Sequence, residues 1–117
     1  MEVQSITKNV RMSAQKMREV VRQIQGLPAA HALSVLAFVP RKGARFVAKT
    51  LKSAIANAED LKEHKKEYSE MKTDRLRVKE ALAQTASTLR RFTPKARGSA
   101  GPILKRSCHV KIVLSDE

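Results

Sequence analysis

The stretch 89–114, LRRFTPKARGSAGPILKRSCHVKIVL, constrains the possible folds of this chain more than any other segment. It contains seven Lys or Arg side chains and no acid. Its middle is made of small and turn-forming residues, and the segments on either side can form strands. We therefore predict a long basic β-hairpin whose tip buries little of its surface against its own protein. Such an element fits best against a negatively charged partner.

The first part of the chain predicts a strand followed by a helix. Residues 2–11 alternate loosely between apolar and polar, which is typical of a strand. Ser13 then suits the N-cap of a helix, because its hydroxyl can accept a hydrogen bond from a free amide of the first turn. Gly26 suits a left-handed stop after that helix. One apolar stripe at helical spacing is formed by Met17, Val20, Val21 and Ile24.

Two further helices are predicted between Gly26 and the middle of the chain. Pro28 can begin the second helix, because its missing amide hydrogen is not needed there, and Pro40 ends it. The inward residues expected in this helix are Leu33, Leu36 and Ala37. The third helix is expected over 41–59 and has a small-residue apolar face formed by Ala44, Val47, Ala48, Leu51, Ile55 and Ala58.

The segment 59–74 is rich in both acids and bases, and we predict a solvated helical extension and connector that faces solvent. Alternation returns at 75–82, with Leu76, Val78 and Leu82 expected on one side, and again at Cys108, Val110, Ile112 and Leu114.

These patterns predict an α+β fold. Three helices pack on a small antiparallel three-stranded sheet, and two of its strands extend into the long basic β-hairpin. The expected organisation is a single domain, 1–117, with a globular foot at 1–82 and 108–117 and an extended hairpin at 83–107.

Charge indicates the class of partner. The net charge is +13, distributed as +8 over residues 1–58, zero over 59–80 and +5 over 81–117. Such an excess is best explained by a polyanion, with nucleic acid first and an anionic membrane surface second. The chain lacks an apolar run of the roughly 18–20 residues that span a bilayer, and its N-terminal residues lack the apolar core of a signal peptide. We therefore expect no membrane partner.

The sequence gives little support for catalysis, a cofactor or a metal site. His31, His64 and His109 are scattered, and Cys108 is the only cysteine, so neither a disulfide nor a cysteine-based metal cluster is expected. Cys108 and His109 are adjacent in a predicted strand and point to opposite faces, which argues against a thiolate–imidazole pair. We expect a protein that is not an enzyme and that works in a reducing compartment.

Three segments resemble one family of proteins. SAIANAE at 53–59, the stretch 89–117 that ends in KRSCHVKIVLSDE, and RMSAQKMREV at 11–20 together resemble bacterial large-subunit ribosomal protein twenty-two. The resemblance covers nearly the whole chain in order. The chain departs from the family at 82–88, where it reads LAQTAST instead of an acidic EGP-containing segment, and in its strongly charged connector. These differences concern local loop geometry.

The resemblance implies a structural constituent of the large ribosomal subunit that binds and helps to assemble large-subunit rRNA. The hairpin would line the nascent-peptide exit tunnel. The implied partners are rRNA, neighbouring large-subunit ribosomal proteins and the nascent peptide, with no homo-oligomer, in a ribosome of the cytoplasm or plastid stroma. The implied rRNA-binding residues are Arg11, Lys16, Arg18, Arg90, Arg91, Lys95, Arg97, Lys105, Arg106, Ser107 and His109. The implied tunnel-facing tip consists of Pro94, Ala96, Gly98, Ser99, Ala100 and Gly101.

Two rival interpretations also fit a basic β-arm. A nucleoid-type DNA-bending protein uses paired arms on an intertwined dimer and wedges proline between base steps, whereas a basic antiterminator or RNA chaperone would act away from the ribosome. Mass in solution tests the first rival, and co-sedimentation with large subunits tests the second.

Overall fold

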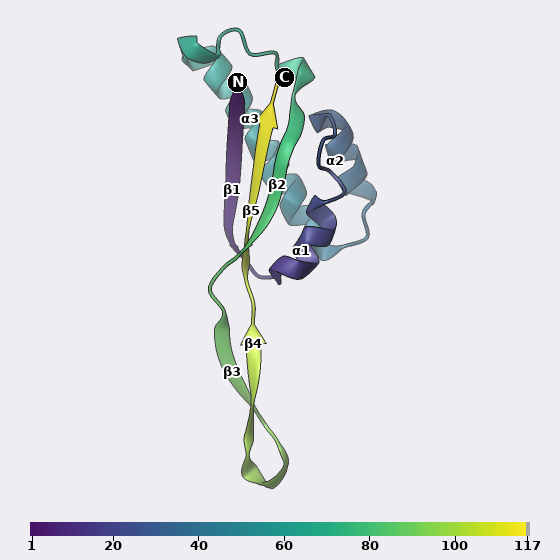
Figure 1. Cartoon of the computed structure of the whole chain (residues 1–117), viewed down its shortest axis with the longest axis vertical. Helices are drawn as coiled ribbons and strands as arrows, with labels where there is room; N and C mark the ends of the chain where they lie inside the picture. Colours follow the sequence, from purple (N-terminus) through teal and green to yellow (C-terminus); the bar gives the residue numbers. More distant parts are fainter. Residues whose placement is uncertain (117) are drawn as a thin grey trace.

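The structure is a computed structural model that describes residues 1–116 and contains three helices and five strands (Figure 1). In chain order these are β1 (Glu2–Val10), α1 (Ala14–Val21), α2 (Ala29–Phe38), α3 (Lys42–His64), β2 (Arg77–Thr85), β3 (Leu89–Pro94), β4 (Ala100–Lys105) and β5 (Cys108–Ser115). Short 3₁₀ turns occur at Lys66–Tyr68, Thr73–Arg75 and Ala96–Gly98. The predicted α+β class with three helices is confirmed, and Glu117, the last residue of the expected foot, lies outside the described residues.

The main sheet is antiparallel, and its strand order is β1-β5-β2. The C-terminal strand β5 is central, so Leu114 pairs with Val3 of β1 on one side and with Val78 of β2 on the other. The helices cover one face of this sheet, and β3 and β4 form a separate two-stranded sheet that projects from one end of it (Figure 1).

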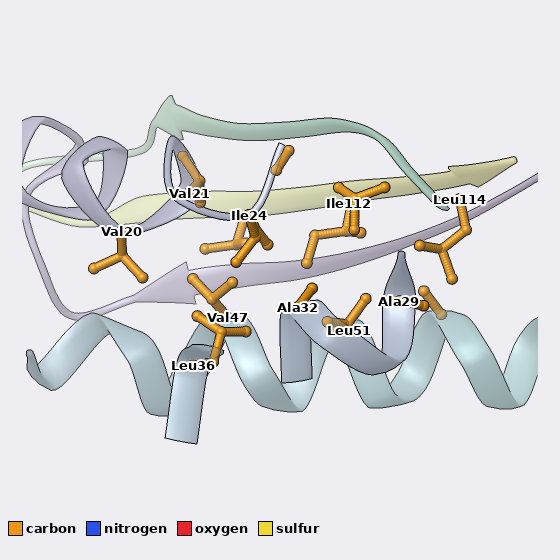
Figure 2. Close-up of a cluster of buried hydrophobic side chains, with 14 of the residues drawn as sticks. Val20, Val21, Ile24, Ala29, Ala32, Leu36, Val47, Leu51, Ile112 and Leu114 are labelled. Atoms are coloured by element: carbon orange, nitrogen blue, oxygen red, sulfur yellow. The ribbon is translucent and has the colours of Figure 1, made fainter. Parts of the chain in front are cut away.

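The core lies between the main sheet and α3 (Figure 2). The four alternating residues of β5, from Cys108 to Leu114, are all fully buried, as predicted. Val47 and Leu51 of α3 face the sheet from the other side, and Val20, Val21 and Ile24 close the layer. Aliphatic side chains and alanines fill this space, which permits close contact between α3 and the strands.

α1 begins as predicted, because the Ser13 hydroxyl accepts a hydrogen bond from the Lys16 amide at 3.3 Å. Its regular turns end earlier than the apolar stripe. The amides of Gln23 and Ile24 then donate hydrogen bonds to carbonyl oxygens three residues back, and this tighter turn brings Ile24 into the core. Gly26 follows with a φ of 78°. A left-handed glycine is the expected way to end such a segment.

In α2, the prediction that Ala37 faces inward is wrong, and Leu33 is only half-buried. The inward face instead consists of Ala29, Ala32 and Leu36. A helix turns 100° per residue, so Ala32 and Leu36 share a side that Ala37 does not. Because the sequence of α2 is apolar on all sides, the pattern alone does not show which side faces the core.

The connector, 59–74, is attached to the foot by one buried side chain, although its composition indicates a fully solvated segment. α3 continues to His64, so the predicted helical extension covers only the first part of 59–74, and most of the following side chains are exposed as predicted. Met71 contradicts the prediction that this segment faces solvent, because it is 1% exposed and belongs to the core. The segment therefore returns to the foot at one apolar anchor.

β2 contains a register irregularity that reverses one predicted side chain. The pairing with β5 shifts between Val78 and Glu80, so one extra residue is inserted there. A β-bulge changes which alternate residues face the core. Ala81 and Ala83 are therefore buried, and the prediction that Leu82 faces inward is wrong, since it is 38% exposed.

The outer edge of β2 is covered by the chain between α1 and α2. The amides of Gly26 and Ala29 donate to the carbonyl oxygens of Val78 and Leu76, and the amide of Val78 donates to Leu27, each at 2.9 Å. An uncovered edge strand is a template for pairing with other chains. Here that edge is occupied by the protein's own backbone.

The molecule is elongated, with principal extents of 67 × 28 × 16 Å. Its radius of gyration is 17.7 Å, against about 13 Å expected for a compact chain of this length. Figure 1 shows the cause, which is the β3–β4 hairpin that projects beyond the foot. At the opposite pole, the N-terminal ammonium contacts the Asp116 carboxylate at 3.0 Å.

Candidate nucleic-acid interface

The hairpin presents nearly all of its side chains to solvent. Every residue of β3 and β4 is exposed except Thr93, Gly101 and Ile103, which are half-buried. Between residues 1 and 116, no carboxylate forms an ion pair with a hairpin cation. The hairpin is therefore a strip of unneutralised positive charge.

The cross-strand register gives the hairpin two faces of different chemistry, because directly paired residues share a face. Arg91 pairs with Ile103, and Leu89 with Lys105. On the alternate face, Phe92 pairs with Pro102 and is 74% exposed. One face thus carries Arg91 and Lys105, and the other carries Arg90 together with an aromatic and proline surface.

The tip is a tight turn held by its own backbone. The Lys95 amide donates to the Ser99 carbonyl oxygen at 2.7 Å, and both Arg97 and Gly98 have positive φ. Gly101 lies beneath the Lys95 side chain, and a Cβ added there would be 2.6 Å from Lys95 Cε. The small residue at 101 therefore lets the Lys95 stem cross the hairpin.

A second group of cations surrounds a cleft at the base of the hairpin. We define the basic cleft by its four cations, Arg11, Lys16, Lys42 and Arg106; Met12, Ser13, Gln15 and Leu104 complete its lining, which contains no acid. The Nη1 of Arg11 donates to the carbonyl oxygen of Arg106 at 2.5 Å. The Nζ of Lys42 lies 3.5 Å from the Arg11 carbonyl oxygen. The basic cleft has a volume of about 640 Å³, which leaves room for a phosphate and the groups attached to it.

The structure thus brings together some of the predicted site residues and separates others. Arg11, Lys16 and Arg106 meet in the basic cleft, which lies at the root of a hairpin that carries Arg90, Arg91, Lys95, Arg97 and Lys105. Lys42 also lines the cleft and is not among the predicted site residues, although the sequence places it at the start of a helix after Pro40.

Arg18 belongs to a different environment. Its Nε donates to the carbonyl oxygen of Ala83 at 3.1 Å, at a partly buried position beside β2. The nearby Cys108 thiol has its pKa raised by burial, and the positive charge of Arg18 opposes that shift. Through its bond to Ala83, Arg18 helps to hold the foot together at the point where the hairpin begins.

Ser107 and His109 also have contacts within the protein. The Ser107 carbonyl oxygen accepts from the Ala86 amide at 3.1 Å and bridges the gap between the two sheets. The Nδ1 of His109 accepts from the Asn9 amide at 3.0 Å, where β1 is irregular and Asn9 has a φ of 58°. In neutral His109 the proton is therefore on Nε2, which remains a potential donor.

The described residues include no group of three or more His, Cys, Asp or Glu that could hold a metal ion. Over the same part of the chain, no helix is both long enough and apolar enough to cross a membrane.

Comparison with known proteins gives a consistent result. The model of the family described as ribosomal protein L22p/L17e matches residues 5–115. A protein of Opitutus terrae named large ribosomal subunit protein uL22 is 49% identical over 99% of this chain and 96% of its own length. Proteins of the same name from Akkermansia muciniphila and Methylacidiphilum infernorum are 44% and 45% identical over the whole of this chain, which covers 98% and 96% of their lengths.

Proposed function

The chain belongs to the ribosomal protein L22p/L17e family, and on that premise we propose that its hairpin and basic cleft bind large-subunit rRNA. The protein is a structural, non-enzymatic constituent of the large ribosomal subunit, and the ribosome is cytoplasmic in bacteria. Neighbouring ribosomal proteins are further partners. The proposal assigns this general role to particular side chains.

The observation that carries the proposal is the unneutralised charge of the hairpin. Its cations are exposed and have no acidic partner in the described chain. A two-stranded ribbon with little apolar burial is only marginally stable in water, and like charges weaken it further. Phosphates on several sides would supply the missing countercharge and release bound counterions.

The residues of the hairpin and the cleft have complementary roles in this proposal. Arg90, Arg91, Arg97 and Lys105 neutralise phosphates along the hairpin, and the basic cleft holds a phosphate group near its root. Folded RNA is recognised mainly by shape, backbone and 2′-hydroxyl contacts, which suits cations on a narrow element. By binding rRNA segments that are distant in sequence, the hairpin would support assembly of the subunit.

The tip is assigned to the nascent-peptide exit tunnel. The residues Pro94, Ala96, Gly98, Ser99, Ala100 and Gly101 are small or rigid, which allows both RNA and a passing peptide to approach closely. Their position at the far end of an extended hairpin supports this role, as does the relationship to the family. The foot, 1–82 and 108–117, would remain nearer the subunit surface as part of one domain and act as a single copy.

A sedimentation experiment tests the proposed location. Large subunits from the source organism, washed in high salt and separated on a sucrose gradient, should retain this chain at a constant ratio to rRNA. Loss of the chain to the top of the gradient would contradict the proposal. An obligate dimer that bends duplex DNA would favour the nucleoid interpretation instead.

A tethered probe tests the placement of the tip. Cys108 is buried, so a Ser99→Cys variant offers one accessible thiol for an iron-based cleavage reagent. In reconstituted subunits, the reagent should cut rRNA around the tunnel, and a crosslinker at Ser99→Cys should reach a stalled nascent peptide. The matched variant Ser69→Cys, in the exposed connector, should give neither result. A Ser99→Cys variant that cuts rRNA but never reaches the peptide would contradict the tunnel assignment alone.

A further inference from the structure

The outer face of α3 carries a row of cations that the hairpin and the basic cleft do not explain. Lys42, Arg45, Lys49 and Lys52 are all exposed. At 100° per residue they fall within an arc of about 80°, and at 1.5 Å per residue they extend over about 15 Å of the helix. Val47 and Leu51 point to the sheet on the opposite side (Figure 2). We name the three cations outside the basic cleft, Arg45, Lys49 and Lys52, the α3 stripe.

The stripe is not explained by the stability of the helix. Within the described chain no carboxylate forms an ion pair with any of its three members. The acids of α3 lie further along it, at Glu59, Asp60 and Glu63. The helix dipole disfavours cations near the N-terminal end of a helix and acids near its C-terminal end, and α3 has this disfavoured order. An external anion would explain both the clustering and this order.

An exposed aromatic side chain and an apolar groove accompany the stripe. Phe38, at the end of α2, is 86% exposed, the highest value among the large apolar residues described. Its chain neighbours, Ala37 and Val39, line a groove between α2 and α3 whose α3 wall includes Arg45 and Lys52. No acid lines this groove. An uncovered phenyl group whose chain neighbours share a groove with unpaired cations has the composition of a single-stranded RNA site, where bases stack on aromatic rings and cations bind the backbone.

We propose that Phe38 and the α3 stripe form a second RNA-binding surface, which takes an unpaired base on Phe38 and the adjoining phosphates on Arg45, Lys49 and Lys52. This inference rests on the proposed binding of large-subunit rRNA and extends it to the helical side of the foot. In Figure 1 the helices lie to one side of the sheet, whereas the hairpin projects from one end. RNA would therefore contact the protein on two differently oriented surfaces.

The test compares two triple variants of the full-length protein in binding to large-subunit rRNA across a salt series. Replacing Arg45, Lys49 and Lys52 with Gln should lower the slope of log affinity against log salt by about 2 to 3. The control replaces Lys62, Lys65 and Lys66 with Gln, which removes the same charge from an exposed segment without a basic excess, and its slope should change by less than 1. Equal effects of the two variants would overturn the α3 site.

Variants at Phe38 separate stacking from general apolar contact. Phe38→Tyr should bind like the wild type, whereas Phe38→Ala should weaken binding by about five- to 150-fold. Footprints of assembled subunits should show an unpaired base that becomes reactive in Phe38→Ala and stays protected in Phe38→Tyr. If both variants bind rRNA like the wild type but release a neighbouring ribosomal protein, the surface binds protein and the inference is wrong.

The experiment also separates this inference from the proposed function. If the hairpin variants lose rRNA binding and the stripe and Phe38 variants bind like the wild type, the second RNA-binding surface is contradicted. The proposed function then stands. Failure of the wild-type chain to bind large-subunit rRNA would remove both.

Discussion

The Nε of Arg18 donates a hydrogen bond to the carbonyl oxygen of Ala83 at 3.1 Å, and this contact ties α1 to the end of β2 at the root of the hairpin. The Nε2 of Gln25 makes the same kind of contact two residues earlier, with the carbonyl oxygen of Ala81 at 2.9 Å. Side chains from α1 and the following turn thus complete the edge of β2 that the backbone of 26–29 covers nearer the other end.

We expect Arg18→Ala to lower the free energy of unfolding by about 1.5 kcal/mol, because a partly buried carbonyl loses a charged donor. Arg22→Ala, which removes an exposed arginine one turn later, should change it by less than about 0.5 kcal/mol. Urea denaturation of both variants measures the difference. Equal stabilities would show that the contact contributes nothing.

Neutralising the hairpin should reduce the salt dependence of rRNA binding. The variant with Gln at Arg90, Arg91, Arg97 and Lys105 loses about four phosphate contacts, so the log–log slope should fall by roughly 3 to 4. A variant with Gln at Lys62, Lys65, Lys66 and Lys72 is the control for total charge. An unchanged slope in the hairpin variant would mean that these residues do not touch phosphate.

Deleting residues 93–102 should leave the foot folded. None of these residues belongs to the buried core, so the apolar burial that stabilises the foot is retained. Far-UV circular dichroism of the deletion variant should keep the helical signal, with a thermal midpoint within a few degrees of the wild type. Collapse of the signal would show that the hairpin tip supports the fold.

The bulge in β2 predicts different effects for the same substitution at two leucines. Leu114 is fully buried in the central strand, so Leu114→Ala should cost about 2–5 kcal/mol. Leu82→Ala, on the exposed side of the bulged strand, should cost less than about 0.5 kcal/mol. Chemical denaturation gives both values, and similar losses would mean that Leu82 is buried in solution.

The Cys108 thiol should be unreactive until the protein unfolds. Burial raises its pKa in the folded state, so the unfolded chain ionises first as the pH rises. The stability that the neutral thiol contributes is complete below the unfolded pKa and declines as the pH rises above it. The stability difference between wild type and Cys108→Ala should therefore shift against the wild type as the pH rises above the ordinary thiol pKa of about 8.5. A thiol reagent should label Cys108 in the native protein no faster than the protein unfolds around it. Rapid labelling of the native protein would contradict this prediction.

Much of the fold follows from local patterns in the sequence. The alternation from Cys108 to Leu114 and the stripe from Met17 to Ile24 match the buried faces because each pattern has one apolar side. The sequence of α2 is apolar on all sides and carries no such information, so it does not show that Ala37 faces away from the core. The position of Leu82 depends on one inserted residue near Val78, and alternation counted from a single strand cannot reveal an irregularity in pairing.

The candidate site was predicted less completely than the fold. The basic character of the hairpin was evident from its composition, since no acid occurs there. The basic cleft depends on tertiary structure, because Lys42 and Arg106 come from distant segments and meet only when α3 packs beside the hairpin root. The contact of Arg18 with Ala83 is likewise long-range, and a basic motif alone does not distinguish a structural arginine from one that is free for RNA.

The central position of β5 determines when the sheet can form. β1 and β2 do not pair with each other, and both depend on Cys108–Ser115, which follows every other element in the sequence. On a translating ribosome, β1 and β2 would wait without a partner until those residues emerge, while the helices can form locally. Long-range pairings of this kind make folding slow and leave strand edges open to aggregation. The native sheet can therefore form only after β5 has been synthesised, and prompt capture by a chaperone or by RNA would protect β1 and β2 before then.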